Sequence, residues 1–323
     1  TKNPTGSLEY YWRGRTDLVT PKFSGIDFSG VTSFRFSWYP CTGLTSFPAI
    51  NMSAGTTFQS AWESCTSLAS MPAIALTAGT DFTNAWKSCT ALTSFLATGL
   101  DSGAIFTQAW RNCTSLTSMP AIPLTAGTNF QSAWDGCSSL TSFLATGLDS
   151  GTIFSTAWYN CTALTTFPAI PFTAGTTFTR AWHNCTSLTS FLATDFTAGV
   201  TFSQAWENVE SLTTFPAIAF PSSATNFSYA WRYCDGMTTF LATGLDSGTT
   251  FLQAWYLDTA LTEMPAIPLT AGLNFTSAWS GCTSLTSFLA TGLDSGTNFT
   301  AAWANCTSLA TFPAIPLTAG LNF

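Results

Sequence analysis

Tryptophan recurs at a fixed interval through most of this chain, and that interval constrains the fold more than any other feature. Successive members lie 24 residues apart, except that 25 residues separate Trp206 from Trp231. A period of about 20 to 50 residues is the signature of a solenoid, in which each coil buries its apolar face against its neighbours. We therefore predict a stacked tryptophan core. Its members are Trp38, Trp62, Trp86, Trp110, Trp134, Trp158, Trp182, Trp206, Trp231, Trp255, Trp279 and Trp303.

Each repeat carries further residues at fixed distances from its tryptophan, and we call each such distance a column. With Trp as zero, Ala stands at −1, Cys at +3, Leu at +6, Phe or Met at +9, Gly at +17 and Phe at +20. The spacing of Phe58, Ala61, Trp62 and Cys65 matches one face of a two-turn helix. The residues after Leu68 favour a brief strand. The sequence therefore predicts a leucine-rich-repeat-like solenoid of about 13 coils, each with a short parallel β-strand and a short helix or 3₁₀ turn.

Two stretches carry a resemblance to a known family. AWRNCTSLTSM at 109–119 and AWHNCTSLTSF at 181–191 resemble the leucine-rich repeats of the BspA-like class of bacterial surface proteins. The resemblance covers residues 38–323, with Trp in place of the usual Phe, and extends to repeats in phage tail proteins. It implies a protein displayed outside cells, on a cell or virion surface, that binds a partner rather than catalysing a reaction.

The ends of the chain differ from the regular repeats. Residues 1–37 are predicted to form a divergent coil or cap with a degenerate repeat at Trp12, because Leu18 stands at +6 from that tryptophan. Residues 38–323 are predicted to form a twelve-coil solenoid. No polar capping coil follows the last repeat, although solenoids normally carry one. The last coil is therefore expected to be open to a further coil.

A second period overlies the first. Column +10 alternates between Pro and Leu, as in Pro72, Leu96 and Pro120, so the unit of duplication spans two coils. Proline has no N–H and removes one hydrogen-bond donor from every second strand. Columns +8, +10 and +12 are predicted to line the outer strand face as a mildly apolar stripe rich in Thr.

All the cysteines occupy column +3, where two coils carry Val209 and Asp258 instead. Cys234 therefore has no cysteine in either adjacent coil, and pairing between neighbours cannot use every thiol. We predict a buried column of small side chains rather than disulfides. A single cysteine per coil also offers no zinc site.

Column +1 holds the variable, charged residues. Opposite charges fall in adjacent coils at Glu63 and Lys87, at Arg111 and Asp135, and at Glu207 and Arg232. In-register stacking predicts three ion pairs. Such surface pairs contribute only about 0 to 1 kcal/mol each.

Irregular features concentrate between Glu207 and Glu263, where one residue is inserted and carboxylates replace the usual Thr or Cys. Glu210 and Asp235 share column +4, and Asp258 stands at +3 in the next coil. Adjacent coils lie about 5 Å apart. These carboxylates are a candidate Ca²⁺ site, although Ca²⁺ takes about 6 to 8 oxygen ligands. The alternative is a set of solvated acids beside Arg232.

Nothing in the sequence predicts catalysis. The only histidine, His183, lies in the variable column +1 and has no Ser, Cys or carboxylate placed to complete a triad. The charged fraction is 8% and the net charge −7, which disfavours a nucleic-acid partner. The apolar runs are too short for insertion into a membrane. We expect no cofactor other than the candidate Ca²⁺, and the Ser and Thr columns could carry glycans.

Three functions fit these observations. In the first, the protein is an extracellular structural solenoid that joins copies of itself end to end into a fibre. In the second, it is an adhesin or phage-tail module that recognises a glycan or surface protein. Ice binding by flat Thr columns is the third. The residues predicted for assembly are Leu8, Tyr10, Tyr11, Trp12, Thr318, Leu321 and Phe323, and those predicted for binding are Tyr159, Tyr229, Tyr233, Tyr256 and Arg232.

Overall fold

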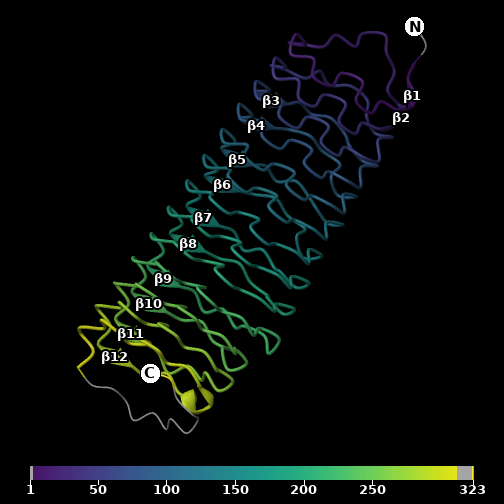
Figure 1. The fold of residues 1–323 in the computed structure, drawn as a ribbon. Coiled ribbons are helices and arrows are strands. Elements are labelled where there is room, and N and C mark those ends of the chain that lie inside the picture. Colours follow the sequence, from purple (N-terminus) through teal and green to yellow (C-terminus); the bar gives the residue numbers. More distant parts are fainter. Residues whose placement is uncertain (1–2, 311–321, 323) are drawn as a thin grey trace. The chain divides into compact units, whose positions relative to one another are not determined.

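The computed structural model describes residues 3–310 and residue 322, and the chain divides into two compact units. Unit 1 comprises Thr1–Ile153 and Ala157–Leu164, and unit 2 comprises Phe154–Thr156 and Thr165–Phe323. Within each unit the backbone winds as a series of similar coils, each stacked on the one before it (Figure 1). This arrangement confirms the predicted solenoid.

The strands are very short and pair in parallel. After the first pair, each strand holds two residues, and strands pair two by two: β3 with β4, β5 with β6, β7 with β8, β9 with β10, and β11 with β12. Their bounds are β1 Thr5–Ser7, β2 Gly30–Ser33, β3 Ser70–Met71, β4 Ser94–Phe95, β5 Ser118–Met119, β6 Ser142–Phe143, β7 Thr166–Phe167, β8 Ser190–Phe191, β9 Thr214–Phe215, β10 Thr239–Phe240, β11 Glu263–Met264 and β12 Ser287–Phe288.

Proline explains the pairing by twos. The N–H of Leu96 donates to the C=O of Met71 at 2.9 Å, which joins a Pro coil to the Leu coil after it. At the next junction the equivalent donor is absent, because Pro120 has no N–H to offer Phe95. The predicted loss of one donor in every second coil is therefore confirmed. It makes two coils the structural unit.

The predicted helix at the tryptophan is wrong. Ala61 donates to the C=O of Phe58 at 3.0 Å, as in a β-turn, but the N–H of Trp62 donates to Ala85 in the next coil at 2.8 Å. Ser60 and Ser64 have φ of 53° and 59°, which a right-handed helix excludes. The segment is thus a run of turns with positive φ at the third residue, as in type II. Among the described residues the one helical segment is the 3₁₀ turn Leu293–Ser295 (η1), which lies elsewhere in its coil.

Two columns adopt positive φ in nearly every coil, namely −2 and +2. Asn, Gln, Ser and Gly predominate there, and Asn and Gly tolerate this region at low cost. Every second backbone N–H of the segment donates to the next coil, as at Ser60, Trp62 and Ser64, and the N–H groups between them close the turns. The residues at −2 and +2 are Phe36, Ser60, Asn84, Gln108, Ser132, Thr156, Arg180, Gln204, Tyr229, Gln253, Ser277 and Ala301, and Ser64, Ser88, Asn112, Gly136, Asn160, Asn184, Asn208, Tyr233, Leu257, Gly281 and Asn305.

The core is a continuous aromatic stack within each unit. Every tryptophan of the series from Trp38 to Trp279 is 0% exposed, and Trp303 is half-buried. In unit 2 the ring centroids of neighbouring tryptophans lie between 5.1 Å apart, for Trp231 and Trp255, and 5.8 Å apart, for Trp206 and Trp231. The predicted tryptophan core is confirmed.

The cysteine column is also confirmed as a packing column. All ten cysteines lie within the described residues and none forms a disulfide. The Sγ–H of Cys65 donates to the C=O of Trp38 in the preceding coil at 3.2 Å, and most of the other cysteines repeat this contact. Burial raises the pKa of Cys113 to about 12, so this thiol is neutral and unreactive at physiological pH.

Threonine has a structural role that the sequence does not reveal. The Oγ1–H of Thr80 donates to the C=O of Thr56, and that of Thr141 to the C=O of Thr117, each in the preceding coil. The same contact recurs in columns +4, +7, +15 and +18. Threonine therefore satisfies carbonyl groups at the edge of each coil.

The strand face differs in part from the predicted stripe. Leu96, at +10, is 54% exposed as predicted, but Ile74, at +12, is only 2% exposed. The N–H of Ile74 donates to the C=O of Pro72 at 2.8 Å, which closes a three-residue turn. This turn reverses the alternation of outward-facing and inward-facing side chains along the segment. In Pro coils Ile therefore enters the core, whereas in Leu coils the side chain at +12 is exposed.

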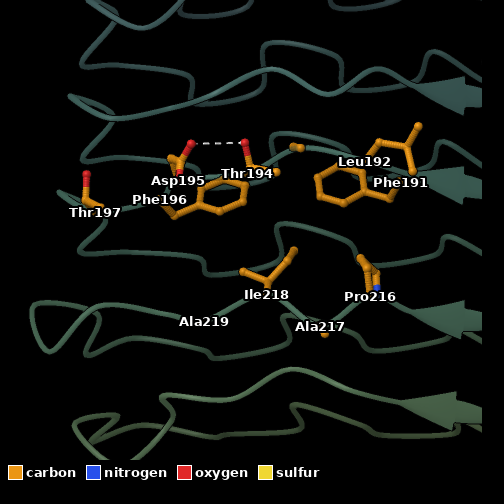
Figure 2. A pocket seen from close by; sticks show the side chains of 11 residues that line it. Phe191, Leu192, Thr194, Asp195, Phe196, Thr197, Pro216, Ala217, Ile218 and Ala219 are labelled. Atoms are coloured by element: carbon orange, nitrogen blue, oxygen red, sulfur yellow. Dashed lines mark hydrogen bonds between the residues drawn. The ribbon is translucent and has the colours of Figure 1, made fainter.

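Hollows lie on this face where a Leu coil meets the Pro coil after it. One hollow of about 480 Å³ lies between the segment 191–197 and the segment 216–219. Figure 2 shows Leu192 and Phe196 on the coil at one side of it, and Pro216 and Ile218 on the coil at the other. A second, of about 250 Å³, has Leu241 on one side and Pro265 on the other. The interrupted strand pairing thus leaves gaps at alternate junctions.

The single insertion is absorbed in one turn. Glycine at +17 leaves no room for a Cβ, because at Gly127 that atom would meet the ring of Phe130. The inserted coil has Ala224 at this place, and its N–H donates to Pro221 at 2.9 Å across the lengthened turn. The stack continues past the insertion.

The N-terminal region contributes a further coil. The ring of Trp12 stacks on that of Trp38 with centroids 5.2 Å apart and planes at 6°. Trp12 is half-buried, unlike the regular members of the series. The ring stacking thus extends to Trp12, and the predicted domain of residues 1–37 stays a prediction.

Candidate functional site

Column +1 carries the three predicted ion pairs. Lys87 Nζ lies 3.3 Å from Glu63 Oε1, Arg111 Nε lies 2.9 Å from Asp135 Oδ2, and Arg232 Nε lies 3.5 Å from Glu207 Oε1. All three predictions are confirmed. Coils that stack in register bring equal columns together, which is why the sequence alone could pair them.

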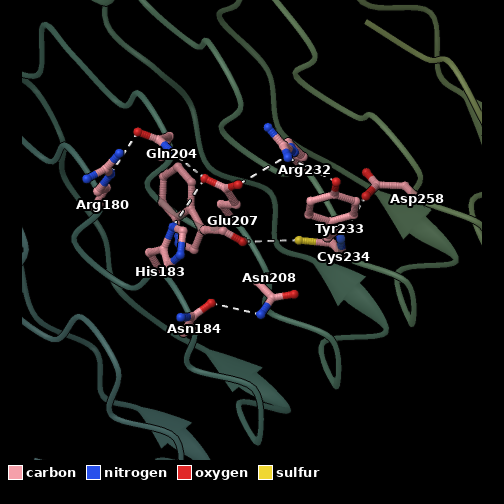
Figure 3. Close-up of polar contacts among 11 residues, drawn as sticks. Arg180, His183, Asn184, Gln204, Glu207, Asn208, Arg232, Tyr233, Cys234 and Asp258 are labelled. Carbon is pink, nitrogen blue, oxygen red and sulfur yellow. Dashed lines mark hydrogen bonds and ion pairs between the residues drawn. The ribbon is translucent and has the colours of Figure 1, made fainter. Parts of the chain in front are cut away.

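Glu207 is the centre of a larger polar network in unit 2 (Figure 3). Its side chain is only 8% exposed, and its carboxylate accepts a hydrogen bond from Gln204 Nε2 at 2.6 Å. His183 Nδ1 lies 3.2 Å from the same oxygen, and Arg180 Nε donates to Gln204 Oε1 at 2.8 Å. With Arg232, the network fixes the orientation of five polar side chains from three coils.

The two buried acids of column +1, Asp135 and Glu207, differ in their electrostatics. Burial acts to raise the pKa of Glu207, but hydrogen bonds from His183 and Gln204 outweigh it, and the pKa is lowered. Burial raises the pKa of Asp135, and Arg111 only partly offsets that effect. Glu207 is therefore held as a carboxylate by more donors than its counterpart in unit 1.

Three tyrosines surround Arg232, and we call Tyr229, Arg232, Tyr233 and Tyr256 the Tyr–Arg cluster. The guanidinium carbon lies 4.4 Å from the ring centroid of Tyr233, 5.4 Å from that of Tyr229 and 5.7 Å from that of Tyr256. Arg232 also donates to the Tyr233 hydroxyl at 2.9 Å. The predicted binding residues of unit 2 thus converge.

The backbone explains the convergence. Tyr229 and Tyr233 occupy columns −2 and +2, with φ of 60° and 61°, on either side of Arg232 at +1. Tyr256 occupies column +1 of the next coil, and its ring meets that of Tyr233 edge to face at 5.8 Å. All four side chains are half-buried. The cluster therefore offers aromatic faces with a fixed cation among them.

The fifth predicted binding residue, Tyr159, lies in unit 1 and is half-buried. The other four predicted binding residues all lie in unit 2, so Tyr159 is not part of the Tyr–Arg cluster. Its predicted role in binding remains a prediction.

Unit 1 contains a second cation–aromatic cluster, which the sequence reasoning missed. The guanidinium of Arg13 lies 5.4 Å from the ring centroid of Tyr10 and 5.6 Å from that of Tyr39. Phe36 stacks on Tyr10 at 5.1 Å. These residues occupy the same columns as the Tyr–Arg cluster. Aligning columns −2 and +1 of the first two coils would have revealed it.

The structure does not assemble the candidate Ca²⁺ site. Asp258 is 0% exposed, and its Oδ1 accepts a hydrogen bond from the N–H of Cys234 at 2.8 Å. Glu210 and Asp235 are exposed. Among the described residues no three His, Cys, Asp or Glu side chains form a group that could hold a metal ion. Asp258 faces the core because column +3 does, so the shared site has no geometric support.

The predicted assembly residues fall into two sets. At the N-terminal end Leu8 is buried, Trp12 is half-buried, and Tyr10 and Tyr11 are 43% and 69% exposed. The other set, Thr318, Leu321 and Phe323, lies outside the described residues. Within the described part of the chain, no helix is long and apolar enough to cross a membrane.

Comparison with known proteins bears on the fold. No family model matches the chain, and no curated protein matches it. Several solved structures, in contrast, do match the chain. A leucine-rich repeat protein from Eubacterium ventriosum is 13% identical, with a TM-score of 0.45, over 97% of this chain and 86% of that one. A leucine rich cell surface protein from Faecalibacterium prausnitzii is 16% identical, with a TM-score of 0.36, over 81% and 77%.

A third similar structure is the functional domain of InlJ from Listeria monocytogenes, which is described as including a cysteine ladder. It is 14% identical, with a TM-score of 0.28, over 80% of this chain and 59% of that one. All three of these similar structures come from bacteria, and two of them are described as leucine-rich proteins. The predicted likeness to phage tail repeats stays a prediction.

Proposed function

We propose that this chain is a non-enzymatic, adhesin-like module displayed on a cell surface, and that it binds an extracellular glycan or protein through the Tyr–Arg cluster. The observation that carries the proposal is the convergence of three tyrosines on Arg232, whose guanidinium lies within 5.7 Å of each ring. Tyr and Arg dominate the energetics of binding surfaces. The surface location is supported by the resemblance to surface repeat proteins.

Preorganisation supports this choice. Arg232 is held by Glu207 and by the Tyr233 hydroxyl, so few side-chain rotations remain to be lost when a ligand binds. Tyrosine supplies a flat apolar face with few rotatable bonds, and an arginine beside it can donate hydrogen bonds. Among the described residues, the ion pairs Glu63–Lys87 and Arg111–Asp135 of the same column have no such aromatic faces.

The test is to measure binding of the intact chain to glycan and protein arrays. The affinity of variants for the ligand found in this way is then measured. Tyr229→Gln with Tyr233→Asn installs the residues that the preceding coil carries at the same columns, Gln204 and Asn208, so the backbone is preserved. We expect at least a tenfold loss of affinity, which corresponds to about 1.4 kcal/mol. The matched control is Tyr11→Asn, which removes an exposed tyrosine of unit 1 that belongs to neither cation–aromatic cluster. Equal binding by the double variant would refute the assignment to this cluster.

No observation on the described residues specifically supports the other predicted functions, ice binding and fibre assembly. The Thr columns are accounted for by hydrogen bonds to neighbouring coils, which weakens the argument for ice binding. End-to-end assembly into a fibre stays a prediction, and electron microscopy at micromolar concentration tests it. Binding of Ca²⁺ is tested by calorimetry, and glycosylation by mass spectrometry.

A further inference from the structure

The strand face of unit 2 carries a row of exposed leucines. Leu192, Leu241 and Leu289 are 50%, 46% and 46% exposed, and we call them the leucine row. They occupy column +10 of alternate coils, so successive members stand about 10 Å apart. Unit 1 has the same feature in Leu96 and Leu144, which are 54% and 53% exposed. Leucine at an exposed position in every second coil is a repeated feature.

A hollow follows each of the first two leucines of the row. The hollow of about 480 Å³ begins at Leu192 and ends at Pro216 (Figure 2). The hollow of about 250 Å³ begins at Leu241 and ends at Pro265. Both exist because proline cannot donate the hydrogen bond that would draw its coil onto the one before it. The face thus alternates between an apolar leucine projection and a recess lined by apolar and Thr side chains.

We propose that the leucine row is a homodimer interface, on which the occupant is a second copy of this chain. Each copy offers both projections and recesses at the same spacing of two coils. A copy displaced by one coil therefore places its leucines over the recesses of the first. Two such faces related by a twofold axis are self-complementary, as an isologous interface requires. A partner without this period could fill one recess but not successive ones in register.

Charge also favours a second copy at this face. The chain has a net charge of −7, so two copies repel each other over most of their surfaces. Among the residues that line the two hollows, only Asp195 and Glu263 are charged. The remaining residues are Leu, Pro, Ala, Ile, Phe and Thr. Contact at the leucine row thus brings two acidic chains together where few charges meet.

The test is sedimentation velocity of the full chain between about 1 and 100 µM. We expect a dimer for the native chain and a monomer for the triple variant Leu192→Thr, Leu241→Thr, Leu289→Thr. Near-UV circular dichroism of the tryptophans verifies that the variant remains folded. The matched control is Leu273→Thr, because Leu273 is also 46% exposed but occupies column +18, outside the row. It should remain dimeric.

A photo-crosslinking residue in place of Leu241 keeps the test decisive if the triple variant fails to fold. Crosslinks to peptides that contain Leu192, Leu241 or Leu289 of another copy support the proposal. A native chain that stays monomeric at 100 µM overturns it, and so does a dimer that survives the triple variant or crosslinks outside the row. The Tyr–Arg variant should dimerise normally, which separates this result from the proposed ligand binding.

Discussion

Two regions of the molecule have the same kind of core but differ in their surfaces. The coils over residues 82–137, in unit 1, follow the repeat closely and carry Cys89, Cys113 and Cys137 in column +3. The coils over residues 202–258, in unit 2, carry Val209, Cys234 and Asp258 there and contain the insertion. Tryptophan rings stack within each region, with centroids 5.3 and 5.5 Å apart in the first and 5.1 and 5.8 Å apart in the second.

The difference shows which columns carry stability and which are free to change. The second region accommodates an extra residue and a buried acid while its Trp and Phe rings remain stacked. Its exposed columns −2, +1 and +2 depart furthest from the repeat, and there the Tyr–Arg cluster forms. Variants that exchange features between the two regions test this separation.

Trp110→Ala, in the regular region, should have the largest effect. The ring is 0% exposed and stacks on Trp86 and Trp134, so its loss opens a cavity between two coils. We expect a loss of about 3 to 5 kcal/mol in the free energy of unfolding, measured by urea denaturation. A loss under about 1 kcal/mol would mean that the stack does not hold the coils together.

Gly127→Ala should be the next most damaging. The added Cβ would meet the Phe130 ring, and relieving that contact costs about 1 to 3 kcal/mol. The coil with the insertion already carries Ala224 at this place. The reverse change Ala224→Gly serves as the control and should cost at most about 1 kcal/mol. Equal losses for both variants would show that the lengthened turn makes no difference.

Asp258→Cys should stabilise the irregular region at neutral pH. Burial raises the pKa of Asp258 well above its usual value, and Oδ2 has no hydrogen-bond partner. The folded state therefore keeps a proton that the unfolded chain loses above about pH 4. The contribution to stability is full below that pH and declines as pH rises toward the folded-state pKa.

Thermal unfolding at pH 4 and pH 7 measures this effect. The gain from Asp258→Cys should be about 1 to 3 kcal/mol at pH 7 and smaller at pH 4. Asp258→Asn keeps an acceptor for the Cys234 N–H but cannot ionise, so its stability should lose this pH dependence. A gain that is the same at both pH values would place the titration elsewhere.

The ion pairs of column +1 should matter least. Lys87 and Glu63 are 25% and 14% exposed, and a double-mutant cycle with Lys87→Ala and Glu63→Ala should give a coupling of about 0 to 1 kcal/mol. A coupling much above that range would mean that the exposed columns contribute to folding as the core does. The same cycle run in high salt should give a smaller value.

The buried columns could be predicted from the sequence because the period itself defines them. Once coils stack in register, the residue at a given column meets the same column in the next coil, which predicted the pairs at Glu63, Arg111 and Glu207. The Pro in column +10 likewise predicted that the strand pairing is interrupted at every second coil, because proline has no N–H to donate.

The helix could not be distinguished from turns by apolar spacing, because two successive turns place side chains at similar intervals. The better signal was the Asn and Gly of column +2, as at Asn112 and Gly136, which favour positive φ. The candidate Ca²⁺ site lacks geometric support for a different reason. Asp258 was grouped with its acidic neighbours, although column +3 had already been assigned to the core.

Hydrogen–deuterium exchange of the intact chain, with and without the ligand found by the arrays, tests the central claim most directly. If the buried columns fold the chain and the Tyr–Arg cluster binds, protection should increase in peptides covering residues 226–236 and 253–258. Amides beside the stacked tryptophans should exchange slowly in both states. Protection that increases instead around residues 191–197, or in the regular coils of unit 1, would contradict the account.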